Sequence, residues 1–116
     1  MAIDYDHLMS IKIPEVRQQY TYRDTLLYAL SLGLGADPME RRHLPFVFEK
    51  NQLCLPTYGT VLGHPGFWLK EMDTGVDWVK IVHAQHELII HQTLQPSGDI
   101  IGEQEIVDVI DRGEGR

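Results

Sequence analysis

The stretch "TYRDTLLYALSLGLGADP", residues 21–38, predicts the helix around which the fold is organised. Thr21 can cap the start of this helix, and Asp24, three residues on, can reach back to it. Gly33 and Gly35 can stop the helix, and Pro38 prevents its continuation. We therefore predict a helix over residues 22–34 with one buried stripe at helical spacing, formed by Tyr22, Leu26, Ala29, Leu30 and Gly33. Because two members of this stripe are small, the helix can lie close against a sheet.

On either side of this helix the sequence favours irregular or extended chain. Residues 1–20 are expected to form an extended arm, in which Pro14 blocks a long helix. In "LPFVFEKNQLCLPTYGTVLG", residues 44–63, Phe46–Phe48 have strand character, but Pro45 and Pro56 bracket the region. We expect short extended pieces and loops there.

Residues 81–94, "IVHAQHELIIHQTL", alternate between apolar and polar side chains. The even positions are mostly apolar and the odd positions mostly polar, which is the pattern of a strand with one buried face. "QPSGD", residues 95–99, then predicts a hairpin-type loop. A second strand is predicted over residues 100–110.

Three histidines in this strand, His83, His86 and His91, raise the question of a metal site. The alternation places His83 and His86 on opposite faces, and His83 and His91 roughly 27 Å apart along one face. In a helix His83 and His86 would be neighbours, but the alternation favours a strand, so we expect no bound metal. His83 and Gln85 either line a ligand cleft beside the strand or form part of a solvated polar face.

The composition narrows the class of protein. There are 10 basic and 17 acidic residues, for a net charge of −7, which argues against a general nucleic-acid binder. No apolar run reaches ~18 residues, so we expect no membrane span, and the N-terminus lacks the pattern of a signal peptide. Cys54 is the only cysteine, which fits a cytoplasmic location. Arg41, Arg42 and His43 are the best local positive charge, which is either a solvated loop or a contact for an anionic ligand.

Four ordered segments, "YTYRDTLLYALSLGLGADP", "LPTYGTVLG", "IVHAQHELIIHQTLQPSGDI" and "EIVDVIDRGEG", give the chain a family resemblance. It resembles the N-terminal half of the MaoC-like, (3R)-specific enoyl-CoA hydratases (hydratase 2), including the hydratase part of peroxisomal multifunctional enzymes. The resemblance implies an α+β hot-dog fold, in which a curved antiparallel sheet wraps a long central helix. Residues 1–116 would form one such domain, with residues 1–20 as an arm and residues 21–116 as the hot-dog. The family has further strands after "DRGEG", so the sheet is expected to be incomplete at its C-terminus, with an open edge beside residues 100–110.

The resemblance also implies a role. The catalytic unit of the family carries an Asp-x-Asn-Pro-apolar-His arrangement that activates the water added across the C2=C3 bond of an enoyl-CoA. That arrangement is absent from this sequence, so no catalytic residue is transferred and enzyme activity is not assigned. The chain is expected to shelter the acyl tail and complete the CoA cleft, with an acyl-CoA thioester as ligand and no cofactor. His83, Gln85, Arg41 and Arg42 are the candidate contacts to CoA.

The sequence is compatible with more than one partner and more than one function. The expected partner is a second copy of the chain or a catalytic hot-dog unit. One alternative is a thioester-binding or regulatory hot-dog module without enzymatic role. Another is a thioesterase-type hydrolase, which needs an acidic residue near the helix N-terminus. Asp24 lies there, but its capping role is the simpler explanation.

Overall fold

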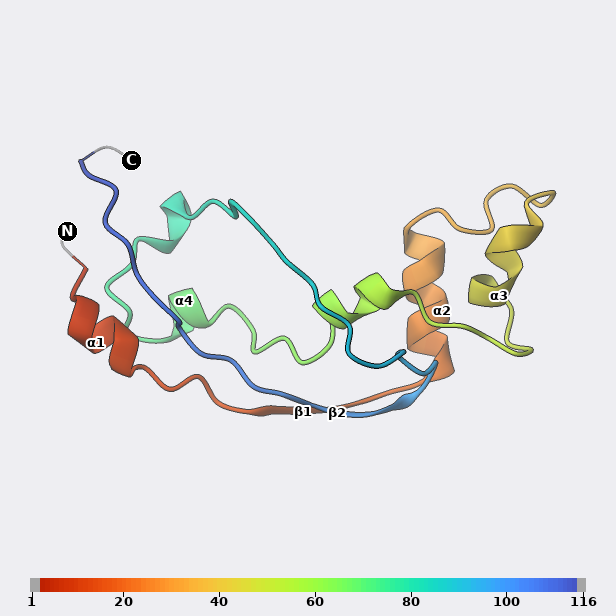
Figure 1. Ribbon diagram of the computed structural model, residues 1–116, viewed down its shortest axis with the longest axis horizontal. Helices are drawn as coiled ribbons and strands as arrows, with labels where there is room; N and C mark the ends of the chain where they lie inside the picture. The colour runs from red at the N-terminus through yellow and green to blue at the C-terminus, as the bar shows by residue number, and fades with distance from the viewer. Residues whose placement is uncertain (1–2, 115–116) are drawn as a thin grey trace.

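The computed structural model describes residues 3–114, and Figure 1 shows an elongated chain with α2 and α3 at one end and α1 beside the C-terminal segment at the other. The principal extents are 54 × 29 × 24 Å and the radius of gyration is 18.3 Å, whereas a compact domain of this length has about 13 Å. Gly115, the last residue of the "DRGEG" segment, lies outside the described residues. In chain order the elements are α1 (Tyr5–Ser10), β1 (Val16–Tyr20), α2 (Tyr22–Ser31), the 3-10 turn η1 (Arg41–His43), α3 (Leu44–Val47), η2 (Pro56–Thr60), α4 (Trp68–Glu71), η3 (Trp78–Lys80) and β2 (Gly98–Gly102).

The predicted start of α2 is confirmed, and its cap is the one that the sequence indicates. Asp24 Oδ2 accepts hydrogen bonds from the backbone N–H of Thr21 at 2.7 Å and from the Thr21 hydroxyl at 3.3 Å. The helix ends at Ser31, before the predicted residue 34. Gly33 adopts φ 92°, a left-handed conformation that favours glycine, so it ends the helix as expected.

The buried face of α2 differs from the predicted stripe. Ala29 is buried as predicted, but Tyr22 and Leu30 are 45% and 46% exposed, and Thr25 is buried instead. The inward face is rotated because the Thr25 hydroxyl is held inside by hydrogen bonds, donating to the carbonyl of Pro96 at 3.0 Å. A polar residue that finds partners can displace an apolar one from the interior.

The sheet has two antiparallel strands, β1 and β2, with Val16 paired to Gly102 and Tyr20 paired to Gly98. The predicted N-terminal arm thus contains a helix and a strand, and β1 pairs with a segment near the other end of the sequence. One strand prediction is wrong, and another is right only in its first residues. Among the described residues, none of 81–94 lies in a strand, and the second strand ends at Gly102 rather than at residue 110.

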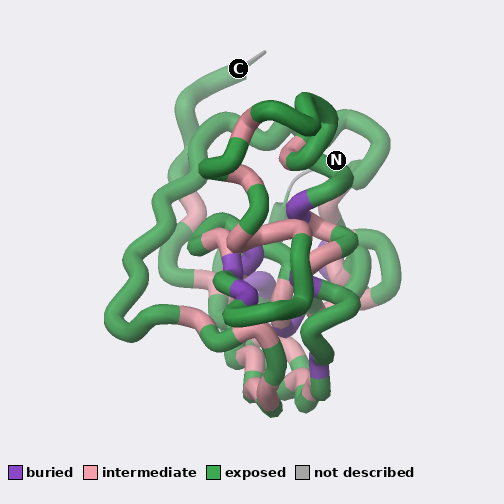
Figure 2. The backbone as a smooth tube through the Cα atoms, turned by 90° about the vertical axis from the view of Figure 1, so that its right-hand side faces the viewer, coloured by how far each residue is buried: buried purple, intermediate pink, exposed green. Residues whose placement is uncertain are grey.

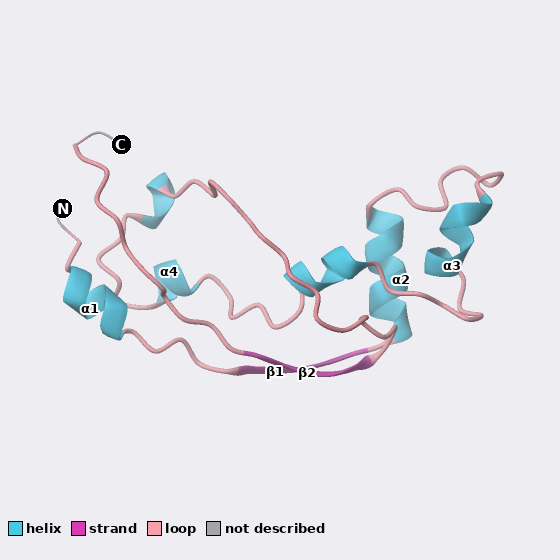
Figure 3. Ribbon diagram, viewed as in Figure 1, coloured by secondary structure: helices cyan, strands magenta, loops and turns pink. Residues whose placement is uncertain are grey.

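The reason for both differences is the lack of a neighbouring strand. Figure 3 shows β1 and β2 as a narrow ribbon, while the chain between η3 and β2 is drawn as loop. Alternation of side chains specifies which face is buried, but a ladder also needs a partner backbone. Residues 95–99 therefore form no hairpin between the predicted strands, and β2 turns to β1 instead.

The small core lies where α2, η2 and the sheet meet. Its buried members are Tyr20, Cys54 and Tyr58, and Tyr28, Leu62, Leu94 and Ile100 pack against them. The rings of Tyr20 and Tyr28 lie 5.7 Å and 5.1 Å from that of Tyr58, in tilted arrangements typical of aromatic packing. Figure 2 shows few buried residues in a mostly exposed chain, and some of them, such as Leu8 in α1 and Thr74 after α4, lie outside this core.

The region of residues 44–63 is irregular, as predicted, with one correction. Phe46 and Val47 belong to the short helix α3 rather than to a strand, because Pro45 occupies its first turn, where proline is tolerated. The turn after η2 then crosses the sheet at very short range. A Cβ placed on Gly102 would lie 2.6 Å from the carbonyl oxygen of Gly63, so only glycine allows this approach.

No helix among the described residues is long and apolar enough to cross a bilayer.

Candidate functional site

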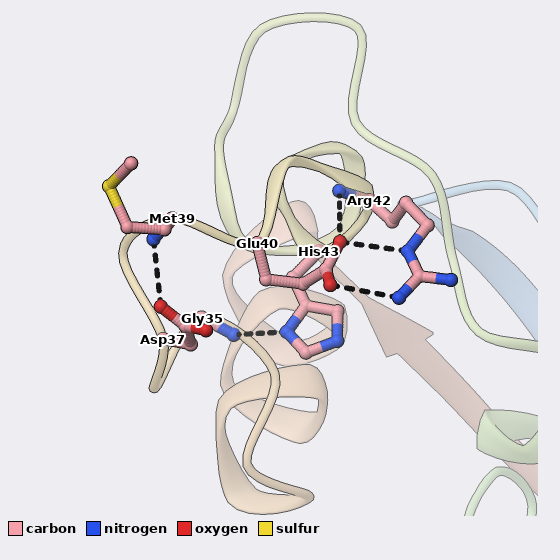
Figure 4. A network of polar contacts seen from close by, with 6 residues as sticks. All are labelled: Gly35, Asp37, Met39, Glu40, Arg42 and His43. Atoms are coloured by element: carbon pink, nitrogen blue, oxygen red, sulfur yellow. Dashed lines mark hydrogen bonds and ion pairs between the residues drawn. The ribbon is translucent and has the colours of Figure 1, made fainter.

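The basic turn η1 is shaped by its own hydrogen bonds (Figure 4). Glu40 precedes the turn and accepts from the backbone N–H of Arg42 at 3.1 Å. The Arg42 guanidinium also donates to both carboxylate oxygens of Glu40, through Nε at 2.8 Å and Nη2 at 2.8 Å. This fork geometry is the strong form of an arginine–carboxylate contact. Arg42 lowers the pKa of the Glu40 carboxyl from 4.5 to about 2, first through its side chain and then through its backbone N–H.

The two arginines of the turn therefore differ. The charge of Arg42 is compensated by Glu40, whereas the side chain of Arg41 makes no hydrogen bond or ion pair with any of residues 3–114. Arg41 is exposed at the surface of the turn. An exposed, uncompensated guanidinium can bind a phosphate group, and Arg41 is the better candidate of the two.

The loop that carries η1 is tied to the end of α2. The backbone N–H of Gly35 donates to Nδ1 of His43 at 3.1 Å, and Asp37 Oδ1 accepts from the backbone N–H of Met39 at 2.9 Å (Figure 4). These contacts fix the position of the turn relative to the helix. They also occupy one ring nitrogen of His43 as an acceptor.

The other pair of predicted site residues, His83 and Gln85, lies on the extended chain after η3. Both are exposed, and a ring nitrogen of His83 lies 2.9 Å from the carbonyl oxygen of Gln85. The prediction that His83 and His86 occupy opposite faces is wrong, because their ring centroids are 5.7 Å apart. The local contact of His83 with Gln85 interrupts the alternation of a regular strand. Two histidines alone do not form a metal site, and residues 3–114 contain no group of three or more metal-ligating side chains.

The four candidate residues are not gathered in one place. Figure 1 shows α3, with η1 just before it, at the far end of the long axis from η3, after which His83 and Gln85 follow. A cleft lined by all four side chains is therefore not formed by this arrangement of the chain.

A hollow that the sequence did not indicate lies along the two strands. It is shallow and open to solvent, with a volume of about 440 Å³, and its lining consists of Arg17, Gln18, Gln19, Asp99, Ile100 and Ile101. Arg17 is paired with Glu15 at 2.9 Å, so its charge is partly compensated. The pairing of β1 with a segment far along the chain creates this hollow, and no local pattern predicts that pairing.

The side chains that could act as a nucleophile or a base, Cys54 and Asp24, have other roles in the structure. Burial raises the pKa of the Cys54 thiol, which keeps it protonated and unreactive. Asp24 is engaged at the cap of α2. Burial also raises the pKa of Tyr58, with smaller contributions from Asp24, Cys54 and Tyr20. Cys54 and Tyr58 belong to the core and Asp24 belongs to a helix cap, so the three do not form an arrangement of base and nucleophile.

The chain is similar in sequence to one family model and to several known proteins. The family model described as the MFE-2 hydratase 2 N-terminal domain matches residues 18–116. The chain is 32% identical over 120 residues to the enoyl-CoA hydratase ChsH3 of Mycobacterium tuberculosis, covering 98% of this chain and 41% of that protein. It is 30% identical to the probable enoyl-CoA hydratase 2 of Dictyostelium discoideum, covering 99% and 40%.

A longer relative also matches most of the chain. The peroxisomal multifunctional enzyme type 2 of Mus musculus is 30% identical over 110 residues, which cover 90% of this chain and 15% of that enzyme. The chain thus spans well under half the length of each of these relatives.

Proposed function

The chain belongs to the MFE-2 hydratase 2 N-terminal domain family, and from this premise we propose that it is the non-catalytic half of a (3R)-specific enoyl-CoA hydratase or dehydratase. In this role it would belong to a hot-dog unit that covers the acyl tail of a fatty or branched acyl-CoA and completes the CoA cleft. Water would be added across the C2=C3 bond by groups outside this chain.

One observation carries this proposal: the family match extends over residues 18–116 while the Asp-x-Asn-Pro-apolar-His arrangement is absent from the sequence. Hydration needs a positioned base for the water and a donor for the proton at the α-carbon. The described side chains support this view, since Cys54 is buried and Asp24 caps α2. A thioesterase-type activity built on Asp24 is disfavoured by the same capping contact.

The hot-dog fold is part of the proposal, and three features support it. A helix and an antiparallel pair of strands are present, the helix packs on the core beside the strands, and many large apolar side chains are left exposed. Large exposed apolar surface costs free energy in water unless it is covered, and further strands would cover it. The acyl tail would be held by apolar surface, a contribution of about 0.8 kcal/mol per buried methylene.

Arg41 is the residue that we propose for the phosphate groups of CoA, because Arg42 is compensated by Glu40. His83 and Gln85 remain proposed contacts on the second segment. Bringing the two segments to one cleft would require a partner, either a second copy of the chain or a catalytic hot-dog unit.

The test is an assay of hydration with crotonyl-CoA and with a longer enoyl-CoA, by the chain alone and mixed with a catalytic hot-dog unit. We expect no turnover by the chain alone, and a larger gain on the longer substrate in the mixture. Robust turnover by the purified chain that is abolished by a point change within it would overturn the proposal.

Arg41→Ala and Arg42→Ala form a matched pair for the CoA contact. Calorimetric titration of the mixture with CoA should show Arg41→Ala weakening binding by about tenfold, the loss of one charge-assisted contact. Arg42→Ala should have a smaller effect. Equal affinities for Arg41→Ala and the unchanged chain would remove Arg41 from the site.

A further inference from the structure

Two aromatic side chains, Phe67 and Trp78, form an exposed pair beside α4, which we call the aromatic corner. Their ring centroids lie 5.6 Å apart and the ring planes make an angle of 83°, an edge-to-face arrangement. Phe67 is 45% exposed and Trp78 is 40% exposed, so both side chains face solvent in part. Phe67 precedes α4 and Trp78 begins η3, and both elements lie at the end of the molecule that holds α1 (Figure 1).

A positive charge already lies on the aromatic corner. The Lys70 ammonium is 4.7 Å from the centroid of the Trp78 ring, within the range of a cation–π contact. Three acidic residues lie on the same stretch of chain: Glu71, Asp73 and Asp77. Lys70 nevertheless forms no ion pair with an acidic side chain of residues 3–114. The indole ring thus binds a cation in this structure, and that cation is part of the chain.

The loop between α4 and η3 is held in place by a buried hydroxyl. Thr74 is only 2% exposed, and its hydroxyl donates to the carbonyl of Leu69 at 3.1 Å and accepts from the backbone N–H of Val76 at 3.2 Å. A ring nitrogen of His7, in α1, lies 2.7 Å from the carbonyl oxygen of Asp73. These contacts fix the loop that joins the two rings, so a ligand does not have to order the aromatic corner when it binds.

We propose that the aromatic corner binds the head group of a quaternary ammonium compound in place of Lys70. The face of an aromatic ring attracts a cation, and quaternary ammonium ligands are the functional example of this contact. The lysine ammonium is strongly hydrated and loses part of its water when it contacts the ring. A quaternary ammonium group has no N–H and is weakly hydrated, so it reaches the same ring face at a smaller cost of desolvation.

The charge of the surrounding chain also favours a cationic ligand. Residues 66–77 contain three acidic residues and one basic residue, Lys70 itself. Asp77 is paired with Lys80 at 3.3 Å, whereas Glu71 and Asp73 form no ion pair with residues 3–114. The net charge of −7 on the whole chain adds a longer-range attraction for cations. The inference does not rest on the proposed function, since no thioester takes part in this contact.

A titration of the complete chain with choline tests the proposal, with the uncharged analogue in which carbon replaces the nitrogen as the control for shape. NMR resolves the indole N–H groups of Trp78 and Trp68, and Trp68 is the internal control because it takes no part in the ring pair. We expect choline to shift the Trp78 signal saturably in the millimolar range, and the analogue to shift it much less. Equal shifts with both compounds, or no saturable shift, would refute the proposal.

Removal of the competing lysine should improve binding. Lys70→Ala frees the ring face, so we expect it to tighten choline binding about threefold, the effect of losing an exposed cation–π contact. Lys50→Ala is the matched control, because it removes the same charge from an exposed residue just after α3, at the other end of the molecule. Equal tightening in both variants would mean that only net charge matters, and the site would be ruled out.

Removal of the ring tests whether Trp78 holds the ligand. Trp78→Leu keeps an apolar side chain without a ring face, so it should lose saturable choline binding, and Phe67→Leu should weaken binding less. Saturation transfer to the choline methyl groups measures both, and circular dichroism checks the fold. Unchanged choline affinity in a folded Trp78→Leu chain would contradict the assignment. If that variant does not fold, the comparison of choline with its uncharged analogue on the unchanged chain decides.

Discussion

The region around α2 and the segment of residues 81–94 differ in how far their side chains are buried. Around α2, a buried network joins three parts of the sequence: Gln52 Nε2 donates to the Thr25 hydroxyl at 2.8 Å and to the Tyr22 carbonyl at 2.9 Å, and Thr25 donates to Pro96. Residues 81–91 are all exposed. The difference shows that periodicity alone does not decide which side chains are buried, because contacts from elsewhere in the chain decide it.

The largest loss of stability is expected at the closest backbone contact in the packed part of the chain, between Gly102 and Gly63. Gly102→Ala should destabilise the fold by about 1–3 kcal/mol, because its Cβ would meet the backbone of Gly63, which cannot move aside as a side chain can. Urea unfolding followed by tyrosine fluorescence measures the change. Gly98→Ala is the matched control in the same strand, since its Cβ would meet only the Tyr20 side chain at 3.5 Å. Equal stability of the two variants would show that the close approach is absent in solution.

The second-largest loss of stability is expected from a change in the polar network of Thr25, Gln52 and Pro96. Thr25→Val keeps the shape of the side chain but removes the hydroxyl, so the carbonyl of Pro96 and the amide of Gln52 each lose a partner. We expect a loss of about 1–3 kcal/mol in the free energy of unfolding. Thr60→Val removes an exposed hydroxyl that bonds only to the Thr57 carbonyl, and it should cost much less. If both variants unfolded at the same urea concentration, the network would contribute nothing.

A change in the exposed segment should matter little. Ile89→Ser, studied at low protein concentration, is expected to alter the free energy of unfolding by no more than about 0.5 kcal/mol, as at other exposed positions. The same urea transition provides the measurement. A loss as large as that of Thr25→Val would mean that this segment is packed in solution, and the contrast between the two regions would disappear.

The smallest effect concerns the exposed pair of Glu40 and Arg42. A carboxyl whose pKa is lowered on folding stabilises the folded state above its ordinary pKa of 4.5, and this contribution is lost as the pH falls toward about 2. Exposed pairs contribute little to stability, so the clear readout is the titration of the Glu40 carboxyl by NMR. Arg42→Gln should raise its midpoint, whereas Arg41→Gln should leave it nearly unchanged. A midpoint insensitive to Arg42→Gln would contradict the ion pair.

These contrasts explain how far the sequence could predict the structure. The start of α2 and its stop at Gly33 depend on neighbours a few residues away, so both were predictable. The inward turn of Thr25 was not, because its partners Gln52 and Pro96 lie far along the chain. The alternation in residues 81–94 predicted a strand with one buried face, but Leu88 and Ile90 stay 38% and 39% exposed, because the pattern could not show whether a neighbouring strand exists.

The candidate site shows the same limit. The basic run identified the turn of Arg41 and Arg42, yet only the geometry distinguishes Arg42, which Glu40 compensates, from Arg41, which has no such partner among residues 3–114. The hydratase family was recognisable from four ordered segments, because a resemblance accumulates over the whole chain. The faces of His83 and His86 were assigned wrongly because one contact to a backbone carbonyl breaks the regular strand.

The pairing of β1 with β2 has a consequence for the time course of folding. Tyr20, at the end of β1, donates to the carbonyl of Gln95, a residue 75 positions further along the chain. During synthesis β1 therefore emerges long before its partner, while α2 can form at once from its local cap. Closing so long a loop is entropically unfavourable, and chains dominated by such distant contacts fold slowly. The helix is thus expected to form early and the ribbon last.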